Sequence, residues 1–296
     1  MASASSRVSF WYAASVAGDR PEGYPFAPAD AEADVAARHV AAQLAEMPRE
    51  ARAPLLGVLH ERSSRLPWSA LHPDWVEPLL AELPPAWRAW GLACLPPPVR
   101  AEMGGEEAGA PPRWWAEWFE RDARQRLRYP ELPPWERAGV LPGSLWERDH
   151  KELVRLLARH GTRGFVSAVR RLGRDEAQRW LWQLPAACQA EATAVASTRA
   201  WSDDPFWLEV FRALGAEAPS AETRIFRLAL ADWARAGLQG GQEGGTRRLA
   251  FRLPRAWGEW LLRQLDLRPS WLARPVEGGL EAWRGALAAL GEGEGT

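Results

Sequence analysis

Lysine is almost missing from this chain of 296 residues, since Lys151 is the only one and arginine supplies the other basic side chains. This scarcity removes most candidates for lysine chemistry. The formal net charge is −1, so no overall electric field favours binding to nucleic acid or to an anionic membrane. No apolar run reaches the roughly 18 residues that a membrane-spanning helix needs. Direct insertion into a membrane is therefore not expected.

Cysteine is also scarce, with only Cys94 and Cys188 present. Such a low content fits a reduced cytoplasm better than a secreted domain held together by disulfides. We interpret both thiols as small buried hydrophobic groups, and a disulfide or a reactive pair is the alternative. The five histidines have no metal-ligand spacing among themselves or with the cysteines. The sequence therefore predicts no metal site, no cofactor and no recognisable nucleophilic catalytic set.

A short motif, Leu/Met-Pro-x-x-x-Arg/Gln-Ala, occurs five times, and a sixth copy lacks the Arg-Ala pair. The copies begin at Met47, Leu83, Leu95, Leu132, Leu184 and, for the degenerate one, Leu253. Proline at the first position of a helix gives up an amide that would be unpaired anyway, and its fixed φ suits the turn. The motif therefore predicts a series of short helices, each opened by a Leu-Pro step.

Residues 72–103 and 161–192 are related, because matching residues recur 89 positions further along the chain. Leu83, Leu95, Val99 and Glu102 correspond to Leu172, Leu184, Cys188 and Glu191 (172 − 83 and 191 − 102 are both 89). We interpret this relation as the internal duplication of a helical unit. The irregular spacing of the Leu-Pro steps distinguishes the chain from an ordinary solenoid array.

Composition predicts two helical units, a first at 31–103 and a second at 113–239, with the repeat core of the second at 161–192. A loosely ordered leader at 1–30 precedes the first unit, and a linker at 104–112 separates the two. After the second unit come a glycine-rich loop at 240–245, a strand-helix segment at 246–290 and a frayed tail at 291–296. Asp149 or His150 is expected to open one helix, and the pair Asp203-Asp204 and Ser220 are expected to open two others. Gly161 is expected to end the helix that starts at Asp149 or His150. Residues 248–253 alternate with a period of two, which predicts one short strand or hairpin in an otherwise all-α fold.

Tryptophan is unusually abundant, with 19 residues against 3 tyrosines and 8 phenylalanines. We interpret about two-thirds of these tryptophans as core residues and the rest as candidate anchors for a partner protein. Stacking on single-stranded nucleic acid is the other use of exposed aromatic rings, but it normally requires a positively charged groove. The near-neutral charge therefore argues against nucleic acid as a partner.

The residues His72-Pro73, Leu83-Pro84 and Leu95-Pro96-x-x-x-Arg100-Ala101-Glu102 resemble the armadillo-like middle domain of the flagellar switch protein FliG and the related cytoplasmic domain of MgtE magnesium transporters. That family's partner-binding motif Glu-His-Pro-Gln stands here as Leu71-His72-Pro73-Asp74, so two of the four residues differ. A shorter similarity between Leu228 and Pro254 is to YscK-type accessory proteins of bacterial type III secretion. The resemblance implies a right-handed superhelix of short helices.

These patterns and the resemblance lead us to expect a non-enzymatic, cytoplasmic scaffold. Its partners would be other protein subunits of a membrane-associated export or motor complex, such as a type III secretion or flagellar-type apparatus, which would hold it at the inner membrane. The expected partner-binding residues are His72, Pro73, Asp74, Trp87 and Trp90.

Two alternatives stay open at this level. One is a regulatory domain that senses magnesium, like the MgtE cytoplasmic domain, and it would need clustered carboxylates on one face. The other is an enzyme whose site is assembled from residues that are distant in the sequence. Asp149, His150 and His160 are the candidates for such a site, and a deep polar pocket that joins them would support it.

Overall fold

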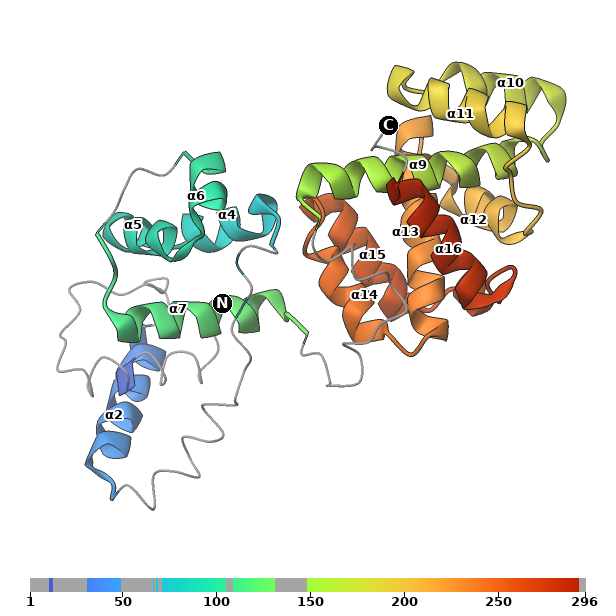
Figure 1. Cartoon of the computed structure of the whole chain (residues 1–296). Helices are drawn as coiled ribbons and strands as arrows, with labels where there is room; N and C mark the ends of the chain where they lie inside the picture. Colours follow the sequence, from blue (N-terminus) through green and yellow to red (C-terminus); the bar gives the residue numbers. More distant parts are fainter. Residues whose placement is uncertain are drawn as a thin grey trace. The chain divides into compact units, whose positions relative to one another are not determined.

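The computed structural model describes residues 11–12, 31–48, 66, 68, 71–104, 109–130 and 148–292. Within these ranges the chain forms thirteen α-helices and no strand (Figure 1), which confirms the predicted all-α class. None of these helices is both long enough and apolar enough to cross a membrane. Most of the leader and the last four residues of the tail lie outside the described residues.

The chain divides into two compact units, Met1–Glu131 (unit 1) and Leu132–Thr296 (unit 2). The boundary follows α7 (Arg113–Leu127), whereas the composition of the chain predicts a linker at 104–112 and this helix in the second unit. Helix α7 belongs to unit 1 because its tryptophans pack against α5 (Pro85–Cys94). The right-handed superhelix that the resemblance implies stays a prediction.

Unit 1 is held together by aromatic side chains on α5 and α7. Trp87 of α5 meets Trp115 and Trp118 of α7 edge to face, with ring centroids 6.1 and 6.4 Å apart. Such pairs contribute about 0.5–1.5 kcal/mol each beyond the area that they bury. The other described helices of this unit are α2 (Ala31–Glu46), α4 (Pro73–Ala81) and α6 (Pro97–Glu102).

Unit 2 is built around α13 (Ala221–Gln239), in which fourteen of nineteen residues are buried. Helix α13 packs most extensively against α9 (His150–Val169). The surrounding helices are α10 (Arg174–Trp182), α11 (Ala186–Thr198), α12 (Phe206–Leu214), α14 (Glu243–Ala250), α15 (Arg255–Leu267) and α16 (Gly279–Glu292). Helices α11, α12 and α16 also pack on α9, while α14 and α15 pack on α13 (Figure 1).

Two helix caps that the sequence predicts are confirmed. The side chain of Asp149 accepts a hydrogen bond from the amide of Glu152 at 2.7 Å, and Ser220 Oγ accepts one from the amide of Thr223 at 3.1 Å. Each bond satisfies an amide that a helix start leaves unpaired and stabilises the protein by about 1 kcal/mol. These caps define the starts of α9 and α13, the two helices that carry the centre of unit 2.

The Leu-Pro steps connect consecutive helices. The leucines at positions 83, 95, 184 and 253 are buried, and each following proline immediately precedes a helix. The proline has an extended ψ, as Pro84 shows with 150°, so it is the residue before the first helical one rather than the first helical residue. Each Leu-Pro step therefore places its leucine in the core, while its proline restricts the direction in which the next helix starts.

The Arg or Gln five residues after the motif leucine caps the preceding helix. Arg88 donates hydrogen bonds to the carbonyl oxygens of Leu80 and Ala81, both at 3.2 Å. Arg100 and Gln189 each donate to the carbonyl oxygen of their own motif leucine at 3.1 Å. The bonds of Arg88 satisfy carbonyls that the end of α4 leaves unpaired. In these three copies the motif thus forms local hydrogen bonds that stabilise the turn between two short helices.

The 89-residue relation extends to the helix starts. Helix α5 begins at Pro85 and α10 at Arg174, while α6 begins at Pro97 and α11 at Ala186 (174 − 85 and 186 − 97 are both 89). Equivalent helices thus start at equivalent positions in the two stretches. This agreement supports the interpretation that the two stretches arose by duplication.

The prediction that Gly161 ends a helix is wrong. Helix α9 continues to Val169, and Gly161 is buried in its middle. A Cβ atom at this position would lie 2.0 Å from the carbonyl oxygen of Ile225 in α13. Position 161 requires glycine because the backbones of α9 and α13 approach too closely there for any side chain. In the sequence, a glycine required by such packing looks the same as a glycine that ends a helix.

The predicted strand at 248–253 is wrong, because residues 248–250 lie in α14. The loop predicted at 240–245 is confirmed only at 240–242, because α14 begins at Glu243. Thr246, Leu249 and Ala250 of α14 are buried, with the spacing of three and four residues that places side chains on one face of a helix. An alternation over six residues is too short to separate a strand from a helix with one apolar face.

Candidate functional site

Unit 2 contains a cavity of about 380 Å³. This volume falls within the range of small-molecule sites, about 300–1,000 Å³. Its wall is formed by α9, α13 and α16, by the start of α12, and by the segments 200–204 and 276–277. The charged side chains of the wall, apart from a histidine, are Arg163, Asp203, Asp204, Asp232, Arg235 and Glu277.

Asp232 of α13 is the centre of a buried polar cluster and is 1% exposed. Its Oδ2 accepts a hydrogen bond from the indole N–H of Trp283 at 2.7 Å and lies 2.8 Å from Nε2 of His160. Its Oδ1 accepts one from Nη2 of Arg235 at 2.5 Å. Burial by itself raises the pKa of Asp232, but the hydrogen bond from His160 and the charge of Arg235 outweigh burial and lower the pKa. Asp232 is therefore ionised at neutral pH, and His160 must carry its proton on Nε2.

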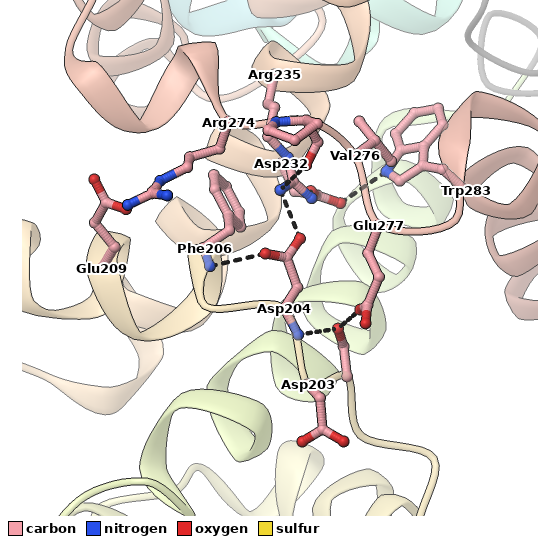
Figure 2. A network of polar contacts seen from close by, with 12 residues as sticks. Asp203, Asp204, Phe206, Glu209, Asp232, Arg235, Arg274, Val276, Glu277 and Trp283 are labelled. Carbon is pink, nitrogen blue, oxygen red and sulfur yellow. Dashed lines mark hydrogen bonds and ion pairs between the residues drawn. The ribbon is translucent and has the colours of Figure 1, made fainter.

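Arg235, which is 2% exposed, connects Asp232 to the start of α12 (Figure 2). Its Nη1 donates to Oδ2 of Asp204 at 2.7 Å and to the carbonyl oxygen of Pro275 at 3.1 Å. The other oxygen of Asp204 accepts a hydrogen bond from the amide of Phe206 at 2.9 Å and caps α12. One buried guanidinium thus joins two carboxylates and three segments of the chain.

Two side chains of α9 that line the cavity have polar atoms without a hydrogen-bond partner among the described residues. His160 has no hydrogen-bond partner at Nδ1 among the described residues. Arg163 lies three residues further along, on the same side of the helix. Within the described ranges Arg163 makes no ion pair or side-chain hydrogen bond, and its Nε is buried. The wall therefore offers the unused N–H groups of Arg163 next to two hydrogen-bonded carboxylates.

Sequence reasoning did not identify Asp232, Arg235 or Trp283 as site residues. One signal was available, because Asp232 and Arg235 stand three residues apart inside the otherwise apolar stretch 228–238. Charged side chains on the buried side of a helix require partners. The partners come from α9, α16 and the start of α12, and no sequence pattern relates these segments to α13.

The expected partner-binding residues all lie in unit 1. His72 caps α4, because its Nδ1 accepts a hydrogen bond from the amide of Asp74 at 3.3 Å. His72, Pro73 and Trp90 are partly exposed and Asp74 is exposed, so these four stay candidates for partner binding. Trp87 is 3% exposed and packs among the aromatic rings of the core, so its expected role as a contact residue is corrected to a core role.

Asp149, His150 and His160 are not brought together by the fold. Asp149 caps α9, and Nδ1 of His150 lies 3.0 Å from the carbonyl oxygen of Arg252. His160 follows His150 by ten residues on the same helix, which corresponds to about 15 Å. In the part of the chain that the structure describes, no group of three His, Cys, Asp or Glu side chains could hold a metal ion.

Helices α10 and α11 form a hairpin that displays an aromatic side chain to solvent. Trp182 is 81% exposed and Leu181 is 43% exposed, and no other described aromatic residue is classed as exposed. Trp180, by contrast, packs edge to face on Phe211 at 5.3 Å, with the guanidinium of Arg224 4.3 Å from its ring. Residues two apart in a helix differ by about 200°, so Trp182 faces away from the core.

Cys94 is expected to be chemically inert in the folded protein. Burial raises the pKa of its thiol to about 11, Glu120 adds to the rise, and Arg100 partly offsets it. At pH 8 the thiolate is then about 100-fold scarcer than in an unperturbed cysteine. In a Cys188→Ala variant, iodoacetamide should label Cys94 about 100-fold more slowly in the native than in the urea-unfolded protein. Mass spectrometry measures both rates, and equal rates would instead favour a reactive thiol.

Comparison of the chain with protein-family models, with curated proteins and with solved structures finds no match. The resemblances to the FliG, MgtE and YscK families therefore stay expectations that rest on the residues that carry them.

Proposed function

We propose that the chain is a non-enzymatic adaptor that docks other proteins, with the tip of the α10–α11 hairpin as a principal contact. The hairpin tip consists of Leu181, Trp182, Ala186 and Ala187, all of which are exposed. The main support for this role is the exposure of Trp182. Tryptophan is enriched at the energetic centres of protein interfaces, where a large ring fills a pocket of the partner.

The hairpin is held rigidly, which favours recognition because little order has to be imposed on binding. Trp180 is fixed between Phe165, Phe211 and the guanidinium of Arg224. Arg224 in turn donates a hydrogen bond to the carbonyl oxygen of Gly215 at 2.8 Å. Helix α11 is anchored on α9, so the indole of Trp182 is presented on a fixed support.

The class of partner that we propose follows the resemblance of residues 72–103: protein subunits of a flagellar-type or type III secretion complex, in the cytoplasm. His72, Pro73, Asp74 and Trp90 would then supply a second contact in unit 1. No observation favours the magnesium-sensing alternative or an enzyme site around Asp149, His150 and His160.

Photo-cross-linking in the native host tests the hairpin tip directly. A benzophenone amino acid placed at position 182 should give a cross-link to one defined protein, identified by mass spectrometry. The matched control is position 267, because Leu267 is 67% exposed on α15 and lies outside the hairpin. No specific product from position 182, or the same products from both positions, would contradict the proposal. A product that contains only this chain would make the partner a second copy.

Replacing Trp182 by serine is expected to weaken binding to the purified cross-linked partner about 30-fold or more, as at an interface hot spot. The melting temperature should change by no more than about 2 °C, because an exposed side chain contributes little to stability. Leu267→Ser is the control and should leave affinity unchanged within about twofold. Isothermal titration calorimetry gives the affinities, and equal affinities for wild type and Trp182→Ser would remove the hairpin tip from the interface.

A further inference from the structure

The cavity in unit 2 has buried N–H groups that the protein does not satisfy. Arg163 is half-buried, and its Nε is buried without an acceptor. Its other N–H donors have no acceptor among the described residues either. Arg235, which also lines the cavity, has no acceptor for its Nε. An unsatisfied buried donor costs free energy, and the cost is recovered when a bound group supplies an acceptor. The N–H groups of Arg163 and Arg235 therefore lack hydrogen-bond acceptors that a bound ligand could supply.

The buried carboxylates of the same wall have their partners already. Asp232 accepts hydrogen bonds from His160, Arg235 and Trp283. Asp204 accepts them from Arg235 and from the amide of Phe206. Neither carboxylate is left to attract a cation into the cavity. Among the described residues of the wall, Arg163 is the cation that has no ion-pair partner.

Two further carboxylates lie at the solvent-exposed part of the wall. Asp203 is 69% exposed and pairs with Arg170, and Glu277 is exposed and accepts a hydrogen bond from Ser202. Neither lies within ion-pair distance of Arg163 in the described part of the chain. These negative charges repel an anion that carries more than one charge. A single carboxylate fits one unpaired guanidinium better than a phosphate does.

The rest of the wall is apolar and aromatic. Trp207 and Trp283 are buried, as is Val276, and Ala286 of α16 lines the exposed side. A ligand with an apolar body gains free energy by leaving water against such surfaces. We propose that this cavity binds a small monocarboxylate with an apolar or aromatic body, held by its carboxylate on the guanidinium of Arg163.

A set of probes that share a phenyl body and differ in charge tests the ligand class. Phenylacetate, phenethylamine, phenylalanine and phenyl phosphate would each be titrated into the full-length protein by calorimetry at pH 7. Phenylacetate should bind saturably, and the other three should bind at least about 10-fold more weakly. Phenethylamine lacks the carboxylate, phenyl phosphate carries a second negative charge, and phenylalanine has an ammonium group for which no buried carboxylate is free. No saturable binding of phenylacetate, or tighter binding of any of the other three, would overturn the proposal.

Arg163→Gln tests the site, since glutamine retains polarity and removes the charge. It should weaken phenylacetate binding about 10- to 100-fold. Arg155→Gln is the matched control, because Arg155 is an exposed arginine of the same helix outside the cavity wall, and it should leave affinity within about twofold. Equal affinities for Arg163→Gln and wild type would overturn the assignment.

A second variant keeps the test independent of Arg163. Ala286 is exposed on α16 and lines the cavity, so Ala286→Phe should occlude the cavity without disturbing the buried core. Phenylacetate binding should fall at least about 10-fold in Ala286→Phe, while circular dichroism and the melting temperature match those of wild type. Undiminished binding would place the ligand elsewhere and overturn the proposal.

Discussion

Replacing Asp232 by alanine is expected to lower the free energy of unfolding of unit 2 by about 3–5 kcal/mol. The substitution removes the shared acceptor of His160, Arg235 and Trp283. Arg235 would then be a buried cation with only one carboxylate partner, Asp204. Breaking one side of a buried ionic cluster is costly, because the groups left behind cannot regain their hydration.

Urea unfolding followed by circular dichroism measures this loss, with the transitions of the two units fitted separately. Asp203→Ala is the matched control, because Asp203 is an exposed neighbour of the same cluster that pairs with Arg170. That substitution should cost less than about 1 kcal/mol. A loss below about 1 kcal/mol for Asp232→Ala as well would show that the cluster does not hold α9, α13 and α16 together.

The difference in stability between wild type and Asp232→Ala is also expected to depend on pH. The pKa of Asp232 is lower in the folded protein than its ordinary value, through the hydrogen bond from His160 and the charge of Arg235 that outweigh burial. Its contribution to stability is therefore fully present above the unfolded pKa of about 3.9 and is lost as the pH falls through the lower folded value. The stability difference between wild type and Asp232→Ala should be constant from pH 5 to 7 and shrink in stronger acid. A difference that grows on acidification would contradict the assignment.

Gly161→Ala is expected to lower the free energy of unfolding of unit 2 by about 3 kcal/mol, the upper end of the usual cost of overpacking. The added methyl group would lie 2.0 Å from the carbonyl oxygen of Ile225 and 2.9 Å from its side chain. Backbone atoms of α13 cannot rotate away as a flexible side chain could. The two central helices would have to separate, and the packing around them would loosen.

Gly285→Ala is the control that isolates this effect. Gly285 lies in α16, and an added Cβ would meet no atom within 4 Å. Because alanine is the better helix former, this variant should gain about 0.5–1 kcal/mol. The same chemical change in two helices of one unit is thus expected to have opposite signs in urea unfolding. A gain in both variants would mean that α9 and α13 do not cross at Gly161.

The candidate site could be predicted only in fragments. The aspartate pair at 203–204 was recognisable as a helix start, and Asp204 does cap α12. Its second role, as acceptor for Arg235, requires the position of α13 beside α12. Trp182 and Trp180 are alike in the sequence, and only the packing of Trp180 on Phe211 shows which of the two faces solvent.

The local structure of this protein follows from residues that are a few positions apart in the sequence. The Leu-Pro steps, the caps at Asp149 and Ser220 and the helical periodicity are of this kind, so the all-α class and most helix starts can be predicted from them. Features that depend on long-range packing require the folded chain. Gly161 lies inside a helix and Asp232 meets His160, because close backbone approach and the sharing of buried charges arise only when distant segments meet.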